Sequence, residues 1–294
     1  MVLPADEPSR RGRAREALLD WFRANDPGYP WRRTSEPYAV LVSEVMLQQT
    51  QAARVAHTFP RFIARFPDVA RLAAASRADV LRQWGALGYP RRAIALHRTA
   101  RMLADDHDGI VPTDPAVLVT LPGVGPYTAA AVASIASAAP VPAVDTNVRR
   151  VVARLAFGRD PDEVPASDIG RAAAGWLDPT EPGDWNQAVM DLGRAVCRWV
   201  PRCDACPLGG VCRFRASGRV ARRSGRRQPP FEGSIRQSRG AVLRELRGRL
   251  RAAPIETIAA SLDLPIPRVD RAVDALERDG LIERTVTGRV RLAR

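Results

Sequence analysis

The chain has 294 residues, a formal net charge of +13 and 46% hydrophobic residues. This apolar fraction excludes wholesale disorder, and no apolar run approaches the roughly 20 residues that span a bilayer. All 45 basic residues are arginine, so no lysine amine is available for a Schiff base. A chain this basic is typical of proteins that bind nucleic acid, although a solvated basic surface would give the same charge.

The predicted elements of the main body are helices. Residues 1–13 are interpreted as a disordered leader without a secretion signal, so we expect a cytoplasmic, nucleoid-associated protein with no membrane partner. An N-terminal helix is predicted within 14–34, where apolar residues recur every three or four positions. Helical periodicity continues through 35–139 and 140–215, and strand signals are scarce, which predicts an all-α body.

The last part of the sequence predicts a separate small domain. A basic stretch with Gly, Ser and Pro, 216–230, is interpreted as a linker, either a solvated tether or a strap that contacts phosphates. Residues 231–294 predict three helices and then a hairpin around Thr287 and Gly288, which is the order of a winged helix. Winged helices bind DNA or proteins, and both remain open here.

A glycine-containing turn joins two predicted helices at LPGVG, residues 121–125. Gly123 and Gly125 allow a tight turn with exposed N–H groups, and these amides can bind a phosphate together with the N-terminus of the next helix. The pattern over 115–137 is a helix-hairpin-helix, which contacts the DNA backbone without reading its sequence. An ordinary helix connection is the alternative, and the net charge favours DNA.

Two carboxylates lie in apolar helical segments. Asp145 precedes a periodic helix in AVDTNVRRVVAR, where the simplest interpretation is an N-cap. Glu44 lies among apolar residues in LVSEVMLQQT, where burial would raise its pKa and keep a proton available for donation. A solvated helix glutamate is the alternative that this segment alone favours.

Four cysteines fall within 16 residues: Cys197, Cys203, Cys206 and Cys212. Such a cluster favours a metal site over a disulfide framework. The spacing suits a [4Fe–4S] cluster or a tetrahedral zinc ion, and the short first spacer favours iron–sulfur. The three histidines, His57, His97 and His107, are scattered and form no metal or triad pattern.

Several motifs between 14 and 212 together carry a resemblance to a known family. They are PWR at 30–32, SEVMLQQTQ at 43–51, GALGYPRRA at 85–93, LPGVGPYTA at 121–129, VDTNVRRVVAR at 144–154, NQAVMDLG at 186–193 and the four cysteines. With them the chain resembles adenine DNA glycosylases of the MutY family, in the endonuclease III-like superfamily. The resemblance implies an all-α, two-lobed fold with a six-helix barrel over 35–139 and a [4Fe–4S] cluster lobe over 140–215, which the N-terminal helix joins.

The resemblance also implies roles for single residues. Glu44 matches the catalytic acid and Asp145 the carboxylate that supports the sugar, while Asn147 would orient Asp145. Gln48 lies where the family wedges a residue into the base stack, with Gln49 beside it as a further DNA contact, and Tyr89 lies where the family contacts the opposing base. The remaining matched positions line the adenine pocket or contact DNA: Trp31, Arg32, Gly123, Gly125, Tyr127 and Asp191.

The implied activity is a monofunctional glycosylase that flips adenine out of double-stranded DNA. Its substrate would be adenine opposite 8-oxoguanine or guanine, removed by hydrolysis, and we expect a monomer. Endonuclease III needs a lysine at the position of Tyr127, so lyase activity is not expected. The alternatives are a thymine or uracil mismatch glycosylase and a non-catalytic iron–sulfur DNA-binding regulator.

The sequence departs from the family pattern at three places. The first cysteine spacer, RWVPR, holds five residues where the family has six, and Thr146 stands where many members have glycine. The C-terminal 231–294 segment resembles a winged helix, where many members carry a Nudix-like domain that reads 8-oxoguanine. Recognition of that base would then depend on the catalytic domain, the linker or the C-terminal helices.

Overall fold

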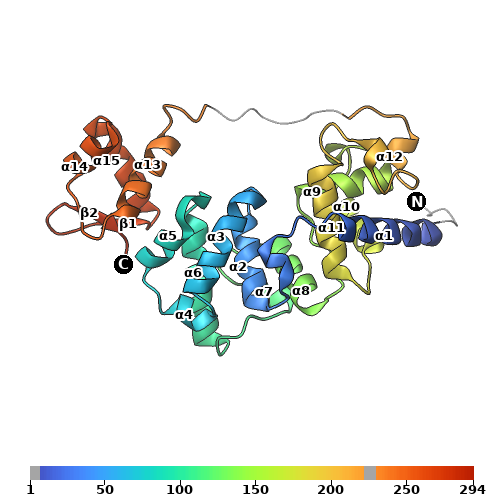
Figure 1. Cartoon of the computed structure of the whole chain (residues 1–294), viewed down its shortest axis with the longest axis horizontal. Coiled ribbons are helices and arrows are strands. Elements are labelled where there is room, and N and C mark those ends of the chain that lie inside the picture. Colours follow the sequence, from blue (N-terminus) through green and yellow to red (C-terminus); the bar gives the residue numbers. More distant parts are fainter. Residues whose placement is uncertain (1–6, 222–229) are drawn as a thin grey trace. The chain divides into compact units, whose positions relative to one another are not determined.

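The computed structural model describes residues 7–221 and 230–294, and these are mostly helical (Figure 1). No helix in the described ranges is both long and apolar enough to cross a membrane. The chain forms two compact units that each combine distant stretches of sequence. Unit 1 comprises Met1–Val40, Pro112–Thr120 and Val124–Arg226, and unit 2 comprises Leu41–Val111, Leu121–Gly123 and Arg227–Arg294.

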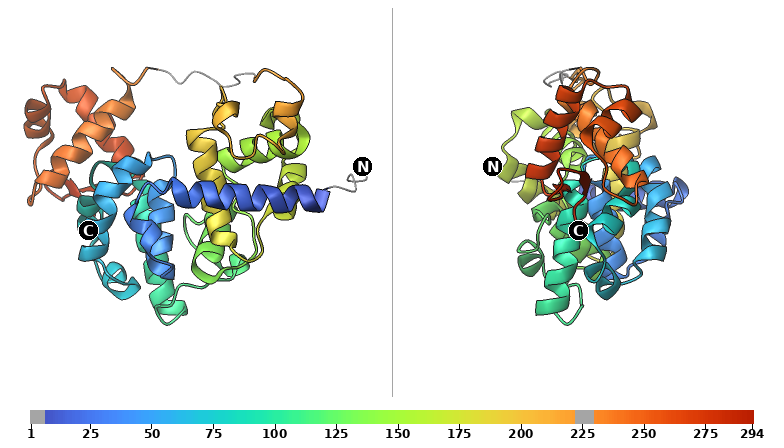
Figure 2. Two further views of the ribbon diagram at one scale, coloured as in Figure 1. Left: turned by 45° about the vertical axis from the view of Figure 1, so that its right-hand side comes forward. Right: turned by 90° about the vertical axis from the view of Figure 1, so that its left-hand side faces the viewer.

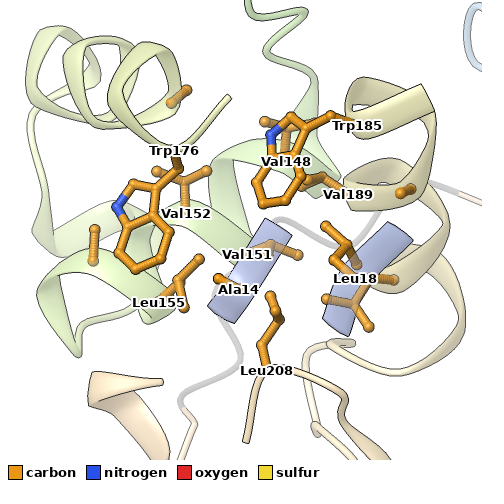
Figure 3. Packing of buried hydrophobic residues seen from close by; sticks show 14 of the residues in the cluster. Ala14, Leu18, Val148, Val151, Val152, Leu155, Trp176, Trp185, Val189 and Leu208 are labelled. Atoms are coloured by element: carbon orange, nitrogen blue, oxygen red, sulfur yellow. The ribbon is translucent and has the colours of Figure 1, made fainter. Parts of the chain in front are cut away.

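Unit 1 is built from helices that enclose one apolar core. Trp176, Trp185 and Leu18 are among its fully or almost fully buried members (Figure 3), and each such side chain contributes about 1.5–3 kcal/mol by leaving water. The helices of unit 1 are α1 (Glu7–Ala24), the 3-10 turn Pro30–Arg33, α7 (Pro115–Leu118), α8 (Pro126–Ser137), α9 (Thr146–Val152), the π-helical turn Ala153–Phe157, α10 (Ala166–Trp176), α11 (Pro182–Ala195) and α12 (Arg213–Ala216).

Helix α1 is longer than the sequence predicted. It runs straight beside α11 (Figure 2), and its first turns are held by arginines that donate to backbone carbonyls. Arg10 donates to the oxygens of Leu155 (2.7 Å) and Val211 (2.8 Å). The expected disordered leader is therefore wrong for residues 7–13, while residues 1–6 lie outside the described part of the chain.

Unit 2 combines the middle of the chain with its C-terminal end. Phe62 contacts Phe66 and Trp84 edge to face at centroid distances of 5.0 and 6.2 Å within its core. Its elements are the greater part of α2 (Pro37–Leu47), α3 (Ala52–Arg65), α4 (Val69–Ala73), α5 (Arg77–Trp84), the turn η2 (Gly85–Leu87), α6 (Arg91–Asp106), α13 (Ile235–Gly248), α14 (Ile255–Leu262), α15 (Ile266–Arg278), β1 (Ile282–Arg284) and β2 (Val290–Leu292).

The C-terminal segment has the predicted winged-helix order of three helices and a hairpin. Strands β1 and β2 pair antiparallel with Ile282 opposite Leu292 and Arg284 opposite Val290. Gly288 has a φ of +74° in the connecting turn, a left-handed conformation that glycine adopts without steric cost. The predicted order of three helices and a two-stranded hairpin is therefore confirmed.

The compact units divide the chain differently from the predicted domain boundaries. Helices α7 and α8 were expected in one barrel with 35–111, but α8 packs on α11 and belongs to unit 1. The C-terminal helix α13 packs on α5 and η2 within unit 2, and Arg247 donates to the carbonyl oxygen of Gly85. Residues 222–229 of the predicted linker lie outside the described residues.

Candidate active site and cysteine cluster

Asp145 is the N-cap of α9, as predicted. Its Oδ1 accepts hydrogen bonds from the backbone N–H groups of Asn147 (2.8 Å) and Val148 (2.7 Å), and the Asn147 side-chain amide donates to Oδ2 at 2.8 Å. Burial raises the pKa of the Asp145 carboxyl, while these hydrogen bonds and the charge of Arg150 act in the opposite direction. The result is a partly buried carboxylate in a fixed orientation.

A buried arginine connects Asp145 to the cysteine segment. Arg150 is 6% exposed, and its Nη2 donates to the side-chain oxygen of Asn147 (2.8 Å) and to the backbone oxygen of Gly193 (2.7 Å). Its Nε donates to the backbone oxygen of Cys197 at 2.7 Å. A continuous hydrogen-bonded chain therefore runs from Asp145 through Asn147 and Arg150 to Cys197.

Gly193 allows this chain of contacts to close. A Cβ atom at position 193 would lie 2.6 Å from the Cβ of Asn147, far inside van der Waals contact. The last residue of NQAVMDLG is therefore glycine because α11 passes directly over Asn147. The sequence alone did not single out this position.

Three of the predicted pocket residues lie together in unit 1. Arg32 Nη2 is 2.7 Å from Asp191 Oδ2, and both side chains are about nine-tenths buried. Trp31 stacks on Tyr29 with ring centroids 4.7 Å apart. The Nε and Nη1 atoms of Arg32 are buried and have no acceptor among the described residues. Buried donors without partners are costly, so they favour a bound group that accepts hydrogen bonds.

The hairpin turn uses its two glycines differently. Gly123 has a φ of +79°, and a Cβ there would lie 2.7 Å from that of Ala95. Gly125 is the N-cap of α8 in an extended conformation that other residues can adopt. Tyr127 lies in the first turn of α8, and its hydroxyl contacts Met190 Sδ at 3.4 Å. The conformational argument for glycine thus holds at position 123 and not at 125.

Glu44 lies on α2 and is 5% exposed. Its neighbours Val42 and Val45 are 0% and 2% exposed, so the alternative of a solvated helix glutamate is wrong.

The predicted DNA contacts of unit 2 lie on two strained turns. Gln48 follows α2, and its amide donates to the backbone oxygen of Gly123 at 3.2 Å. Gln49 and Tyr89 have φ values of +53° and +46°, which are uncommon for residues with side chains. Tyr89 is also 53% exposed. Strained backbone with an exposed aromatic ring is typical of a binding surface.

Arg92, which the sequence analysis did not single out, holds these turns together. Its Nη1 donates to the backbone oxygens of Val45 (2.8 Å) and Met46 (3.0 Å), and its Nη2 donates to Thr50 Oγ1 (2.8 Å). Its guanidinium lies 5.2 Å from the ring centroid of Tyr89. Burial lowers the pKa of Arg92 to about 10, so it remains charged at neutral pH.

The four cysteines, whose spacing predicts a metal site, line one pocket in unit 1. Burial raises the pKa of the thiols of Cys197, Cys206 (to about 12) and Cys212, so metal binding must release protons from them. Arg154 is 1% exposed, and its Nη1 lies 3.6 Å from Cys197 Sγ, where it can offset thiolate charge.

The cysteine pocket fits a sulfur-ligated cluster. Four thiols and no carboxylate line it, which is a soft donor set. No three cysteine, histidine or acidic side chains in the described ranges are arranged to hold a single metal ion.

Comparison with known proteins places this geometry in a family. Residues 42–168 match the family described as HhH-GPD superfamily base excision DNA repair protein. The adenine DNA glycosylase of Mycobacterium tuberculosis is 45% identical over 290 residues, which cover 94% of this chain and 92% of that protein. The chain belongs to the adenine DNA glycosylase family. It is therefore a DNA N-glycosylase of base excision repair.

Other members of the adenine DNA glycosylase family differ in how much of the chain they match. The Mycolicibacterium smegmatis relative is 44% identical, covering 94% of both chains. The human relative is 41% identical over 213 residues, which cover 68% of this chain and 39% of that protein. Because 94% coverage must include most of residues 231–294, the mycobacterial relatives extend into the C-terminal domain.

Solved structures confirm the endonuclease III-like fold. A thermostable thymine-DNA glycosylase has a TM-score of 0.67 at 25% identity, covering 72% of this chain and 99% of that chain. A non-covalent endonuclease III–DNA complex has a TM-score of 0.59 at 26% identity, covering 71% and 97%.

Proposed function

We propose that this glycosylase removes adenine opposite 8-oxoguanine or guanine from duplex DNA, as a monomer, and leaves the strand uncut. The observation that carries the proposal is Asp145, a partly buried carboxylate that three hydrogen bonds hold in one orientation. Such a group can stabilise positive charge that develops on a sugar as its bond to the base breaks.

Glu44 is the proton donor of this proposal. Adenine is a poor leaving group until a ring nitrogen is protonated, so the reaction needs an acid that keeps its proton near neutral pH. The burial of Glu44 on α2 supports that role. General acid catalysis of this kind contributes roughly 10²–10⁴ in rate.

Arg32 and Asp191 form one wall of the proposed adenine site, beside Trp31. The unsatisfied Nε and Nη1 of Arg32 can donate to ring nitrogens of adenine, which are acceptors. Gln48 would then enter the base stack with Gln49 beside it as a further DNA contact, and Tyr89 would contact the opposing base, with Arg92 holding both turns. Base extrusion costs a few kcal/mol, which such contacts offset.

The absence of strand cleavage follows from the side chain at position 127. A lyase attacks the sugar with an amine, and the chain contains no lysine while arginine stays protonated. Tyr127 occupies the first turn of α8, where an amine would be needed in this superfamily.

We propose that Cys197, Cys203, Cys206 and Cys212 hold a [4Fe–4S] cluster. When bound, the cluster supplies four covalent ties that fix the 197–212 segment. Arg150 and Arg154 hold the same segment through the backbone oxygens of Cys197 and Arg198. Iron and sulfide analysis of the purified protein tests the assignment, and one zinc with no iron would overturn it.

The deciding experiment is a base-release assay on matched duplexes. Each carries A, G, C or T opposite guanine or 8-oxoguanine, and strand breaks are measured with and without alkali. We expect adenine release, faster opposite 8-oxoguanine, and breaks only after alkali. The likeness to a thymine-DNA glycosylase favours thymine release as the second candidate. Thymine release without adenine release would replace the proposal by that candidate.

A further inference from the structure

The charge of the C-terminal domain, residues 230–294, is distributed unevenly. Helix α15 contains three arginines and three acidic residues, so it carries no net charge. Arg284 on β1 pairs with all three of these carboxylates: Asp270, Asp274 and Glu277. The third helix is the usual DNA-reading element of a winged helix. Here Arg271 and Arg278 are exposed on α15, but the acidic residues of the same helix offset their charge, so α15 attracts a polyanion less than an uncompensated cluster would.

A different part of the same domain is strongly cationic. The loop between α13 and α14 and the turn between β1 and β2 border a cavity of about 400 Å³; Figure 1 labels these helices and strands. Arg249, Arg251 and Arg289 line this cavity, and no acidic side chain does. Arg249 pairs with Glu245 at 2.7 Å, whereas Arg251 and Arg289 are exposed and form no ion pair with any described residue.

The backbone fixes the two free arginines beside one cavity. Ala253 and Val290 exchange two hydrogen bonds, N–H to oxygen, at 2.9 and 2.8 Å, and both residues are buried. Arg251 lies two residues before Ala253, and Arg289 lies one residue before Val290, so this pair of hydrogen bonds holds the backbone at both arginines close together. The turn itself is closed by the hydrogen bond from Gly288 N to Thr285 O at 2.9 Å.

Two guanidinium groups without an ion pair to any described residue border one cavity that no carboxylate lines, so an anion bound there would meet uncompensated positive charge. Guanidinium groups match phosphate oxygens with paired hydrogen bonds. We propose that the cavity lined by Arg249, Arg251 and Arg289 binds a backbone phosphate of the substrate DNA. The C-terminal domain then contacts DNA through this loop and turn and not through α15. The inference requires only that duplex DNA is the substrate, whichever base is removed.

The test compares two matched double variants of the full chain. Arg251→Ala with Arg289→Ala removes the cavity charges, and Arg271→Ala with Arg278→Ala removes two charges from α15. Affinity for a labelled duplex with one A·G mismatch is measured across salt concentrations. The slope of log affinity against log salt should fall by about 0.9 for each phosphate that the variant no longer neutralises. Between about 50 and 200 mM salt, wild type should therefore lose at least roughly 3.5-fold more affinity than the cavity variant.

Four controls accompany the comparison. The α15 variant should retain the wild-type slope, and Arg251→Lys with Arg289→Lys should retain it also because the charge is kept. Thermal unfolding shows whether each variant is folded, and single-turnover base release with saturating enzyme should equal wild type. If wild type releases no adenine, the proposed substrate fails while the salt slopes still test the cavity.

Several outcomes would overturn the proposal. An unchanged slope in the cavity variant would mean that a protein partner or nothing occupies the cavity. A larger loss in the α15 variant would place α15 against DNA. Stabilisation of wild type by inorganic phosphate, beyond chloride at equal ionic strength and without any effect on the DNA slope, would assign the cavity to a small anion.

Discussion

Replacing Asn147 by alanine should separate the orientation of Asp145 from its presence. The change removes the hydrogen bond to Asp145 Oδ2 and the acceptor for Arg150 Nη2, each 2.8 Å long. The backbone N–H groups of residues 147 and 148 still hold Oδ1, and Gly193 still accepts from Arg150. One charge-assisted hydrogen bond is worth about 1.5–3 kcal/mol, so adenine release should slow by about tenfold to a hundredfold.

The pH dependence gives Asn147→Ala a second, independent readout. The Asn147 side chain is one of the groups that lower the pKa of Asp145 against the effect of burial. Without it the pKa of Asp145 rises further. In a plot of single-turnover rate against pH, the acid limb, where the rate falls as Asp145 becomes protonated, should therefore move to higher pH. A purely structural role for Asn147 would lower stability and leave that limb in place.

Asn186→Ala is the matched control. Asn186 is also buried, and it hydrogen-bonds to Val141, Ser134 and Ala143 without contacting Asp145. Both variants should lose about 1–3 kcal/mol, or a few degrees in unfolding temperature. Only Asn147→Ala should shift the acid limb. The proposed orientation of Asp145 by Asn147 would be refuted if the acid limb lay at the same pH in both variants. A base-release rate for Asn147→Ala within twofold of wild type would also refute it.

Four further outcomes are expected. Glu44→Gln should keep DNA affinity near wild type and abolish base release, measured by binding and single-turnover assays, because shape remains while the proton is lost. Gly193→Ala should push Asn147 away and slow base release in single-turnover assays, and thermal unfolding should show that the variant is still folded. Because burial raises the pKa of Asp145, its ionised carboxylate lowers the free energy of unfolding. This destabilisation is lost as the pH falls through the pKa of the folded state. Thermal unfolding should therefore show wild type gaining stability relative to Asp145→Asn on acidification. Tyr127→Lys should become trapped on DNA by borohydride, and a folded, DNA-binding variant that is never trapped would show that position 127 does not face the sugar.

Features that depend on residues close together in the sequence could be predicted from it. The N-cap at Asp145 and the glycine at 123 could be predicted because the interacting atoms lie within a few residues or within one turn. Likewise, the shared pocket of the four cysteines follows from their short spacing.

The residues that the sequence did not reveal act across long separations. Arg150 donates to an oxygen 47 residues away, and Arg92 donates to oxygens 46 and 47 residues before it. In a chain with this much arginine, nothing distinguishes such side chains from solvated ones. The start of α1 was missed for a related reason, because arginine-to-carbonyl contacts hold its first turns and not an apolar stripe.

Unit 2 combines stretches that lie far apart in the sequence, and this determines when the unit can be completed during synthesis. Its first stretch begins at Leu41, but helix α13, which packs on α5 and η2, and strand β2, which packs on α5, come from the last 68 residues, Arg227–Arg294. All segments of unit 1 have been made once Arg226 is synthesised. Residues 41–111 must therefore wait until at least Arg247 has been synthesised before that side chain can reach the carbonyl of Gly85. A premature stop codon near residue 230 would leave that earlier stretch without its partner helix, so nonsense variants there should be handled by the cell as folding defects.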